Sequence, residues 1–103
     1  RKSRREGRAA VALNFEWDRV KAERNLRKHT VGFEEAATVF ADPLSETIYD
    51  PDHSDDEERF IIVGRAASGK LLVVSHMDLG DTIRVIGALP ATALERRAYE
   101  EGE

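Results

Sequence analysis

The alternation of apolar and polar residues at the start of the chain predicts a short strand followed by a helix. Leu13 to Glu16 is a short extended piece. Asp18 is a suitable N-cap for a helix that runs to about Lys28, and Trp17 before it can pack as a hydrophobic staple. Because positions three, four and seven apart share a helix face, this helix has a core face and a basic face. The core face carries Ala22, Leu26 and His29, and the basic face carries Lys21, Arg24 and Lys28.

A second apolar repeat predicts another helix after the break at Val31-Gly32. Apolar residues recur at positions i, i+3, i+4 and i+7, where the chain has Phe33, Ala36, Ala37 and Phe40. Asp42-Pro43 ends this helix, because the residue before a proline is disfavoured in the helical conformation.

The second half of the chain is rich in β-branched residues, which predicts a series of strands. The expected strands are Leu44 to Tyr49, Arg59 to Arg65, Lys70 to Met77 and Thr82 to Ala88. Short breaks at Ser68-Gly69 and at Asp78 to Asp81 separate the last three, a spacing typical of an antiparallel meander.

A third helix is predicted after Pro90. Thr92 and Glu95 match the capping-box pattern, and helix-forming residues continue to Glu101. The order of elements predicts an α+β fold, in which an antiparallel sheet is covered by two N-terminal helices and a C-terminal helix.

Composition indicates a single domain in a reducing compartment. The 103 residues are enough for one modest core, and the absence of cysteine excludes disulfides and thiolate metal sites. We predict a flexible basic tail over residues 1–12 and one domain over residues 13–103. Because no apolar run reaches the roughly 18 residues of a membrane span, and the basic start has no apolar core behind it, we expect a cytoplasmic protein without membrane contact.

Charge is distributed unevenly around the net value of -4. Between Asp42 and Glu58 the chain has eight acidic residues and no Lys or Arg. A calcium loop of the EF-hand type starting at Asp50 would require glycine where Asp55 stands and a carboxylate where Ile61 stands. We therefore interpret residues 50–58 as a hydrated charged loop. Any RNA would instead be drawn to a local basic patch of Lys21, Arg24 and Lys28.

The three histidines indicate no metal site. They lie far apart on different predicted elements and do not have the spacing of zinc ligands. Ser75, His76 and Asp78 are the residue types of a hydrolase triad, but neighbouring residues of one strand point to opposite faces. His76 alone could carry a proton near neutral pH, or could be a strand histidine with a backbone partner.

The C-terminal region offers a second set of chemical groups. Thr92, Glu95 and Tyr99 fall at i, i+3 and i+7, which aligns them on one helix face, and Arg84 lies on the preceding strand. A guanidinium can hold a phosphate by two parallel hydrogen bonds, while a carboxylate or phenol could move a proton. These groups could support metal-free RNA cleavage by the 2′-hydroxyl. The same spacing is also that of a helix cap with a salt bridge.

These residues, taken in order, resemble the BrnT toxins. The resemblance extends from Phe15 to Glu101. It is carried by Phe15-Glu16-Trp17-Asp18, Lys21, Asn25-Leu26-Arg27-Lys28-His29, Val31, Phe33-Glu34-Glu35-Ala36, Phe40, Asp42-Pro43, Glu58-Arg59-Phe60, Gly64-Arg65, Leu71 to Val74, Arg84-Val85-Ile86, Ala91-Thr92, Glu95-Arg96-Arg97 and Tyr99.

The resemblance implies a RelE-like fold and a bacterial ribonuclease toxin that cleaves RNA without a metal or other cofactor and arrests growth. It implies a BrnA-like antitoxin with a ribbon-helix-helix part, and contact with operator DNA only through that antitoxin, so that the complex represses its own operon. The expected catalytic residues are Lys21, His29, Arg65, Arg84, Glu95 and Tyr99. The expected RNA-binding residues are Arg24, Lys28, Arg59 and Thr92.

One departure from the family pattern bears on activity. Family members usually have Ile-Ser-x-Arg at the end of the last strand, where this chain has Ile86, Gly87, Ala88 and Leu89. A leucine cannot replace the charge-assisted contacts of an arginine with phosphate. Three hypotheses follow: an active ribonuclease, a catalytically weakened toxin that mainly binds its antitoxin and takes part in autorepression, and a non-toxic binding module with a borrowed fold.

Overall fold

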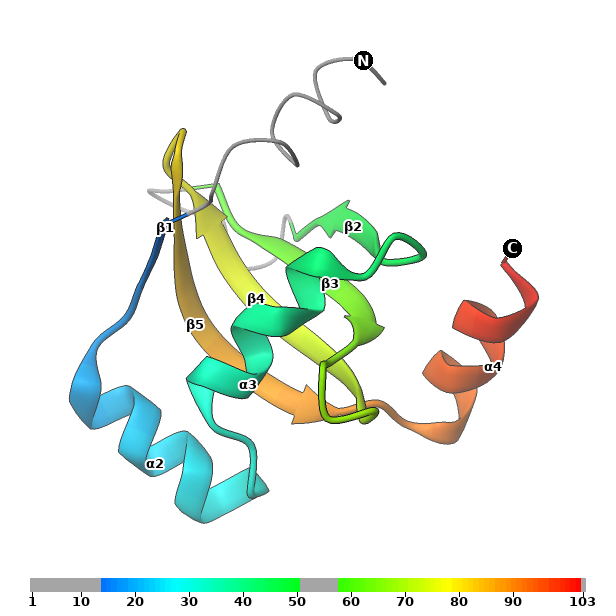
Figure 1. The fold of residues 1–103 in the computed structure, drawn as a ribbon, viewed down its shortest axis with the longest axis horizontal. Coiled ribbons are helices and arrows are strands. Elements are labelled where there is room, and N and C mark those ends of the chain that lie inside the picture. The colour runs from blue at the N-terminus through cyan, green and yellow to red at the C-terminus, as the bar shows by residue number, and fades with distance from the viewer. Residues whose placement is uncertain (1–13, 51–57, 103) are drawn as a thin grey trace.

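The computed structural model describes residues 14–50 and 58–102, which build a five-stranded sheet and the helices around it (Figure 1). The predicted tail over residues 1–12 and most of the acidic loop lie outside the described residues. The elements are β1 (Asn14–Glu16), α2 (Arg19–His29), α3 (Phe33–Ala37), the short 3₁₀ helix η1 (Thr38–Ala41), β2 (Glu46–Tyr49), β3 (Phe60–Arg65), β4 (Leu71–Asp78), β5 (Thr82–Pro90) and α4 (Ala93–Glu101). The predicted order of elements is confirmed.

The sheet has the strand order β1-β5-β4-β3-β2. Strands β3 to β5 form the predicted antiparallel meander, and β2 extends it by pairing antiparallel with β3. Its turns contain Gly69 and Gly80 with φ values of 95° and 92°, a conformation that glycine adopts without strain. The edge strand β1 pairs in parallel with β5, so that the sheet is mixed. A hairpin turn does not set the direction of β1, because the helices and three strands separate it from β5 along the chain.

Helix α3 lies across one face of the sheet, with the core between them, and α2 lies beside β5 (Figure 1). Phe33 and Ala36 are buried as the apolar repeat predicts, and Phe40 packs at the edge of the same cluster. The cluster also includes Val31, Val39, Ile62, Leu72, Val74, Val85 and Ala88.

The predicted core face of α2 is corrected at two positions, Leu26 and His29, because His29 lines a surface groove instead of the core. Leu26 is 53% exposed, while Ala22 packs against the core and Asn25 turns toward β5. Hydrogen bonds from the Asn25 amide to buried backbone favour this orientation of the helix over one that buries the leucine. Trp17 packs edge-to-face on Phe33, with ring centroids 6.0 Å apart, so that it anchors the start of α2 to α3.

Helix α4 begins with the predicted capping box. The Thr92 hydroxyl accepts a hydrogen bond from the Glu95 backbone N–H at 3.1 Å, and the Glu95 carboxylate accepts one from the Thr92 backbone N–H at 2.8 Å. In Figure 1 this helix lies at the right of the view, apart from α2 at the left. Among the described residues, no helix combines the length and apolar character needed to cross a membrane.

Candidate active site

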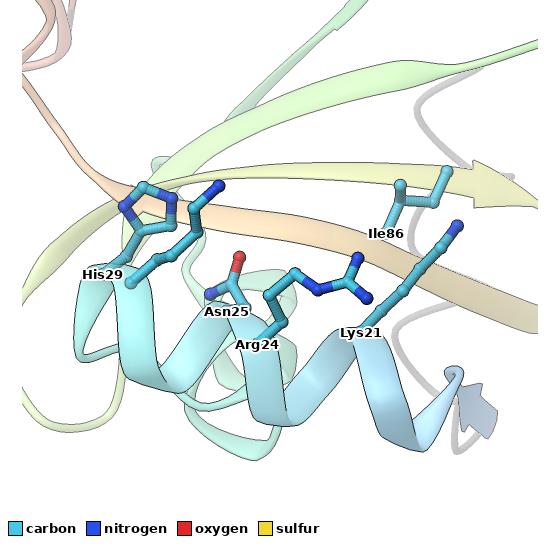
Figure 2. Close-up of a pocket in the computed structure, with 6 residues that line it drawn as sticks. Lys21, Arg24, Asn25, His29 and Ile86 are labelled. Atoms are coloured by element: carbon cyan, nitrogen blue, oxygen red, sulfur yellow. The ribbon is translucent and has the colours of Figure 1, made fainter.

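A basic groove lies between α2 and β5 and encloses about 230 Å³. We call it the basic groove; its lining residues are Lys21, Arg24, Asn25, Lys28, His29 and Ile86. Figure 2 shows Lys21, Arg24, Asn25 and His29 projecting from the same side of α2 toward β5. None of these lining residues is acidic, although the whole chain has a net charge of -4. The groove therefore concentrates positive charge where an anion can bind.

Both ends of α2 are fixed, which holds the cationic side chains over β5. At the first turn the Asp18 carboxylate accepts a hydrogen bond from the Lys21 backbone N–H at 2.9 Å. At the last turn Thr30 adopts a left-handed conformation with a φ of 55°, and its backbone N–H donates to the Leu26 carbonyl. The cations of the last turn also lie where the helix dipole favours positive charge.

Asn25 connects α2 to the sheet. Its side-chain amide donates to the Val31 and Ala88 carbonyls, each at 2.9 Å, and its oxygen accepts from the Ala88 N–H at 3.2 Å. Strand β1 pairs with β5 only up to Arg84, so that the outer edge of β5 is open at Ala88. The Asn25 side chain takes the place of a peptide group on a neighbouring strand and thereby fixes the width of the basic groove.

A β-bulge places Ile86 in the basic groove. Ser75 of β4 is opposite Gly87, and the next residue, His76, is opposite Val85, so that Ile86 has no partner on β4. A bulge redirects the side chain of the extra residue. Ile86 consequently lines the groove between the two buried residues Val85 and Ala88.

A second hollow, of about 410 Å³, adjoins the basic groove near the start of α2. We call it the Trp17 hollow; it is lined by Glu16, Trp17, Asp18, Lys21, Arg84, Val85 and Ile86. Arg84 donates from both Nε and Nη2 to Oε2 of Glu16, each at 2.6 Å, and both side chains are about half exposed. A phosphate entering here would compete with Glu16 for the Arg84 guanidinium.

Arg65 and Tyr99 form a different cluster with Asp42. The Tyr99 hydroxyl donates to the Asp42 carboxylate at 2.6 Å, and the Arg65 guanidinium lies 5.6 Å from the centre of the Tyr99 ring and donates to the Gly69 carbonyl. The contacts of Tyr99 with Asp42 and with Arg65 of β3 attach α4 to the sheet.

The pKa values of this cluster follow from the same bonds. Burial by itself would raise the pKa of Asp42, but hydrogen bonds from Tyr99 and from the Arg65 and Leu44 backbone, with the charge of Arg65, lower it overall. The hydrogen bond to Asp42, followed by burial, raises the pKa of Tyr99. Tyr99 is therefore held in its protonated form and is poorly suited to accept a proton.

The six predicted catalytic residues thus separate into two groups. Lys21, His29 and Arg84 line the basic groove or the adjoining Trp17 hollow. Arg65, Glu95 and Tyr99 belong to the cluster around α4 or to its cap. Of the predicted RNA-binding residues, Arg24 and Lys28 line the basic groove, Thr92 caps α4, and Arg59 precedes β3, two strands away from β5.

His76 is buried in the sheet and contributes to neither group. It is 3% exposed, its ring lies between Phe40 and Phe60, and its Nδ1 atom has no hydrogen-bond partner among the described residues. Burial lowers the pKa of His76, against smaller opposing effects of the Val74 backbone and Asp78. Within residues 14–50 and 58–102, no three His, Cys, Asp or Glu side chains are grouped so that they could hold a metal ion.

Six residues that line the basic groove or the Trp17 hollow were not predicted as site residues from the sequence: Glu16, Trp17, Asp18, Asn25, Val85 and Ile86. Asn25 and Glu16 both belong to the family pattern given above. Asn25 stands close to Lys28 in that pattern, and Glu16 stands next to Trp17, so that their places in the pattern could have identified them as site residues. Ile86 reaches the groove only because of the bulge in β5, for which the local sequence carries no signal.

Comparison with known proteins identifies a related family and a related fold. Residues 17–95 match a family model described as the ribonuclease toxin BrnT of type II toxin-antitoxin systems. The crystal structure of the Brucella abortus ribonuclease toxin BrnT resembles this chain with a TM-score of 0.57 and 19% sequence identity, over 79% of this chain and 99% of that one. No curated protein sequence matches the chain. The structural likeness supports the α+β fold, with the mixed sheet described above.

Proposed function

Because the chain belongs to the BrnT family of ribonuclease toxins of type II toxin-antitoxin systems, we propose that it binds and cleaves RNA in the basic groove. The observation that carries the proposal is the convergence of Lys21, Arg24, Lys28 and His29 on one groove of an acidic chain. Lys and Arg side chains that neutralise phosphates supply most of the sequence-independent affinity for a nucleic acid.

The dimensions of the basic groove suit a short stretch of RNA. Lys21 and Lys28 are seven residues apart on α2, which corresponds to about 10 Å along the helix axis. This length is enough for neighbouring phosphates of one short stretch of RNA to reach different cations. The three cations can then contact consecutive phosphates.

The groups around the groove support cleavage by the 2′-hydroxyl without a metal ion. In that reaction the 2′-oxygen bonds to phosphorus and loses its proton, while the bond to the 5′-oxygen breaks and that oxygen gains a proton. His29 is the side chain of the groove that can carry a proton to or from these two oxygens. Lys21 and Arg84 lie near the start of α2, about 12 Å along the helix from His29, and neutralise neighbouring phosphates of the bound strand, with Arg84 exchanging Glu16 for a phosphate oxygen. Arg65, Glu95 and Tyr99 hold α4 in place in this proposal.

Cleavage assays with purified protein test the proposal. The protein should degrade single-stranded RNA in the presence of a chelator, and Arg84→Ala or His29→Gln should abolish cleavage without changing the circular dichroism spectrum. Lys28→Gln should weaken RNA binding and lower the salt slope by about one. The matched control is Arg27→Gln, which removes the same charge from an exposed neighbour outside the groove. Cleavage that requires an added metal, or equal effects of the two glutamine variants, would contradict the proposal.

We further propose that the protein acts in the bacterial cytoplasm, arrests growth, and is neutralised by a BrnA-like antitoxin with a ribbon-helix-helix part. Family membership supports an antitoxin partner. The complex would contact operator DNA through the antitoxin and repress its own operon. Co-expression with the product of the adjacent gene should restore growth and yield a stable complex, whereas arrest that persists in the presence of that product would contradict this partner.

A second hypothesis, a catalytically weakened toxin, is favoured by Leu89, which stands where the family pattern has arginine. Leu89 is 45% exposed and does not line the basic groove, so that Lys21, Arg24 and Lys28 are present in the groove without it. If the toxin is weakened, Leu89→Arg should arrest bacterial growth more strongly than the natural sequence. Equal and strong arrest by both chains would rule out the weakened toxin and leave the active ribonuclease.

A further inference from the structure

The Trp17 hollow differs from the basic groove in its chemistry. Its lining includes three apolar residues, Trp17, Ile86 and Val85, of which Val85 is buried in the core. Its polar groups include two carboxylates, those of Glu16 and Asp18, in addition to the two cations at Lys21 and Arg84. An anion alone would gain little from a surface that presents both signs of charge, whereas a flat heteroaromatic ring with polar edges could use all of these groups.

The Trp17 ring is held in a fixed position. It packs edge-to-face on Phe33, which is 1% exposed, with an angle of 81° between the ring planes. The preceding residue belongs to β1 and the next one caps α2, so that the backbone on both sides is also fixed. A half-buried aromatic ring that loses little freedom on binding is a suitable platform for stacking.

The Trp17 hollow adjoins the basic groove, because Lys21 and Ile86 line both of them. A phosphate held by Lys21 would therefore place the attached nucleotide at the mouth of the Trp17 hollow. From this geometry we propose that the Trp17 hollow binds an unpaired nucleobase, stacked on Trp17, next to the phosphates in the basic groove. The proposal rests on the proposed ribonuclease function and specifies its substrate as single-stranded RNA.

The carboxylates determine which bases fit best. An ionised carboxylate only accepts hydrogen bonds, so that Glu16 and Asp18 favour a base that carries an exocyclic amino group. Cytosine has such a group where uracil has an oxygen, and the two bases otherwise have the same size. In a duplex this amino edge is paired and both ring faces are stacked, which excludes paired bases from the hollow.

Trp17 is the only tryptophan in the chain, so that its fluorescence reports directly on this hollow. The probes are fluorescein-labelled 2′-O-methyl oligoribonucleotides, eight cytidines or eight uridines long, which cannot be cleaved through the 2′-oxygen. Binding is followed by fluorescein anisotropy and, with unlabelled probe, by tryptophan emission. We expect quenching of the emission at saturation by the cytidine probe, tighter binding of cytidine than uridine, and no quenching by a duplex.

Substitutions of Trp17 provide an independent measurement. Trp17→Phe keeps an aromatic ring and should bind the cytidine probe with nearly unchanged affinity, whereas Trp17→Leu should bind it about tenfold more weakly, as expected for loss of one stacked base. Urea denaturation of both variants shows whether each is folded. Lys28→Gln should weaken binding but leave the amount of quenching at saturation unchanged.

The possible outcomes separate this inference from the proposed function. Probe binding by anisotropy without any change in tryptophan emission overturns the base site, as does equal affinity of folded Trp17→Leu and wild type. Equal affinity for cytidine and uridine probes overturns the role of the carboxylates. If the protein cleaves RNA but shows one of these results, the ribonuclease function stands and the base site fails. If it neither cleaves RNA nor binds the probes, both proposals fail.

Discussion

Replacement of Asn25 by alanine should lower the free energy of unfolding by more than is usual for a half-buried residue on a surface helix. The substitution removes three hydrogen bonds at once, to the Val31 carbonyl and to both backbone groups of Ala88. Val31 and Ala88 are 0% and 1% exposed, so that water has poor access to the groups left without a partner. The loss affects the attachment of α2 to β5 and hence the basic groove.

The magnitude follows from the number of bonds. A hydrogen bond within a protein contributes about 1 kcal/mol net, which gives about 3 kcal/mol for the Asn25 side chain. This is a large part of the roughly 5–15 kcal/mol by which domains are stable. For a domain of this size, 1 kcal/mol lowers the melting temperature by about 4–8 °C, so that the variant should melt about 12–24 °C lower.

Urea and thermal denaturation followed by circular dichroism measure this effect. The control is Glu23→Ala, an exposed position on the same helix, which should change the free energy of unfolding by no more than about 0.5 kcal/mol. Asn25→Asp should be at least as damaging as Asn25→Ala near neutral pH, because it replaces two donors by an anion that faces carbonyl oxygens. A loss below about 1 kcal/mol for Asn25→Ala would show that Asn25 does not hold α2 to the sheet.

Three further predictions concern other parts of the fold. Burial lowers the pKa of His76, so that the unfolded chain binds a proton at a higher pH than the folded chain, and the free energy of unfolding should decrease as the pH falls below about 6.5. Urea denaturation of His76→Phe at several pH values should show a smaller decrease. Identical pH profiles for the variant and wild type would contradict this role of His76. Gly64→Ala would place a methyl carbon 2.8 Å from the Ser45 Cβ and should lower stability by about 1–3 kcal/mol, whereas an unchanged urea midpoint would show that the site has room. The hydrogen bond from Tyr99 lowers the pKa of Asp42, so that this bond stabilises the fold above the unfolded pKa near 3.8 and its contribution is lost on acidification. The difference in free energy of unfolding between wild type and Tyr99→Phe should therefore shrink as the pH falls below about 4. A difference that stays constant with pH would refute the link between this bond and the ionisation of Asp42.

The candidate site could be predicted from the sequence only in part. Helical spacing placed Lys21, Arg24 and Lys28 on one face of α2, and all three line the basic groove. The same reasoning grouped Arg84 with Thr92, Glu95 and Tyr99, because they follow one another closely along the chain. The structure separates them, since Arg84 pairs with Glu16 on β1 while Tyr99 bonds to Asp42 after η1. Residues that are close in sequence can therefore contact different elements, as Arg84 on β5 and Tyr99 on α4 do here.

The sequence alone determined the elements whose signals are local. The cap at Asp18, the apolar repeat from Phe33 to Phe40, the glycine turns and the capping box at Thr92 each depend on residues within one or two turns, and each is present in the structure. The residues from Phe15 to Glu101 also carry enough of a pattern to indicate the family, which the match over residues 17–95 confirms.

Only the tertiary structure decided what depends on contacts between distant segments. The parallel pairing of β1 with β5, the bulge at Ile86 and the turn of Asn25 toward Ala88 all arise from backbone hydrogen bonds between parts of the chain that are far apart in sequence. The apolar pattern of α2 favoured Ala22, Leu26 and His29 as its core face, but the backbone groups at the edge of β5 made the polar side chain of Asn25 the better partner there. The basic groove and the adjoining Trp17 hollow exist because of these long-range hydrogen bonds, which local periodicity cannot show.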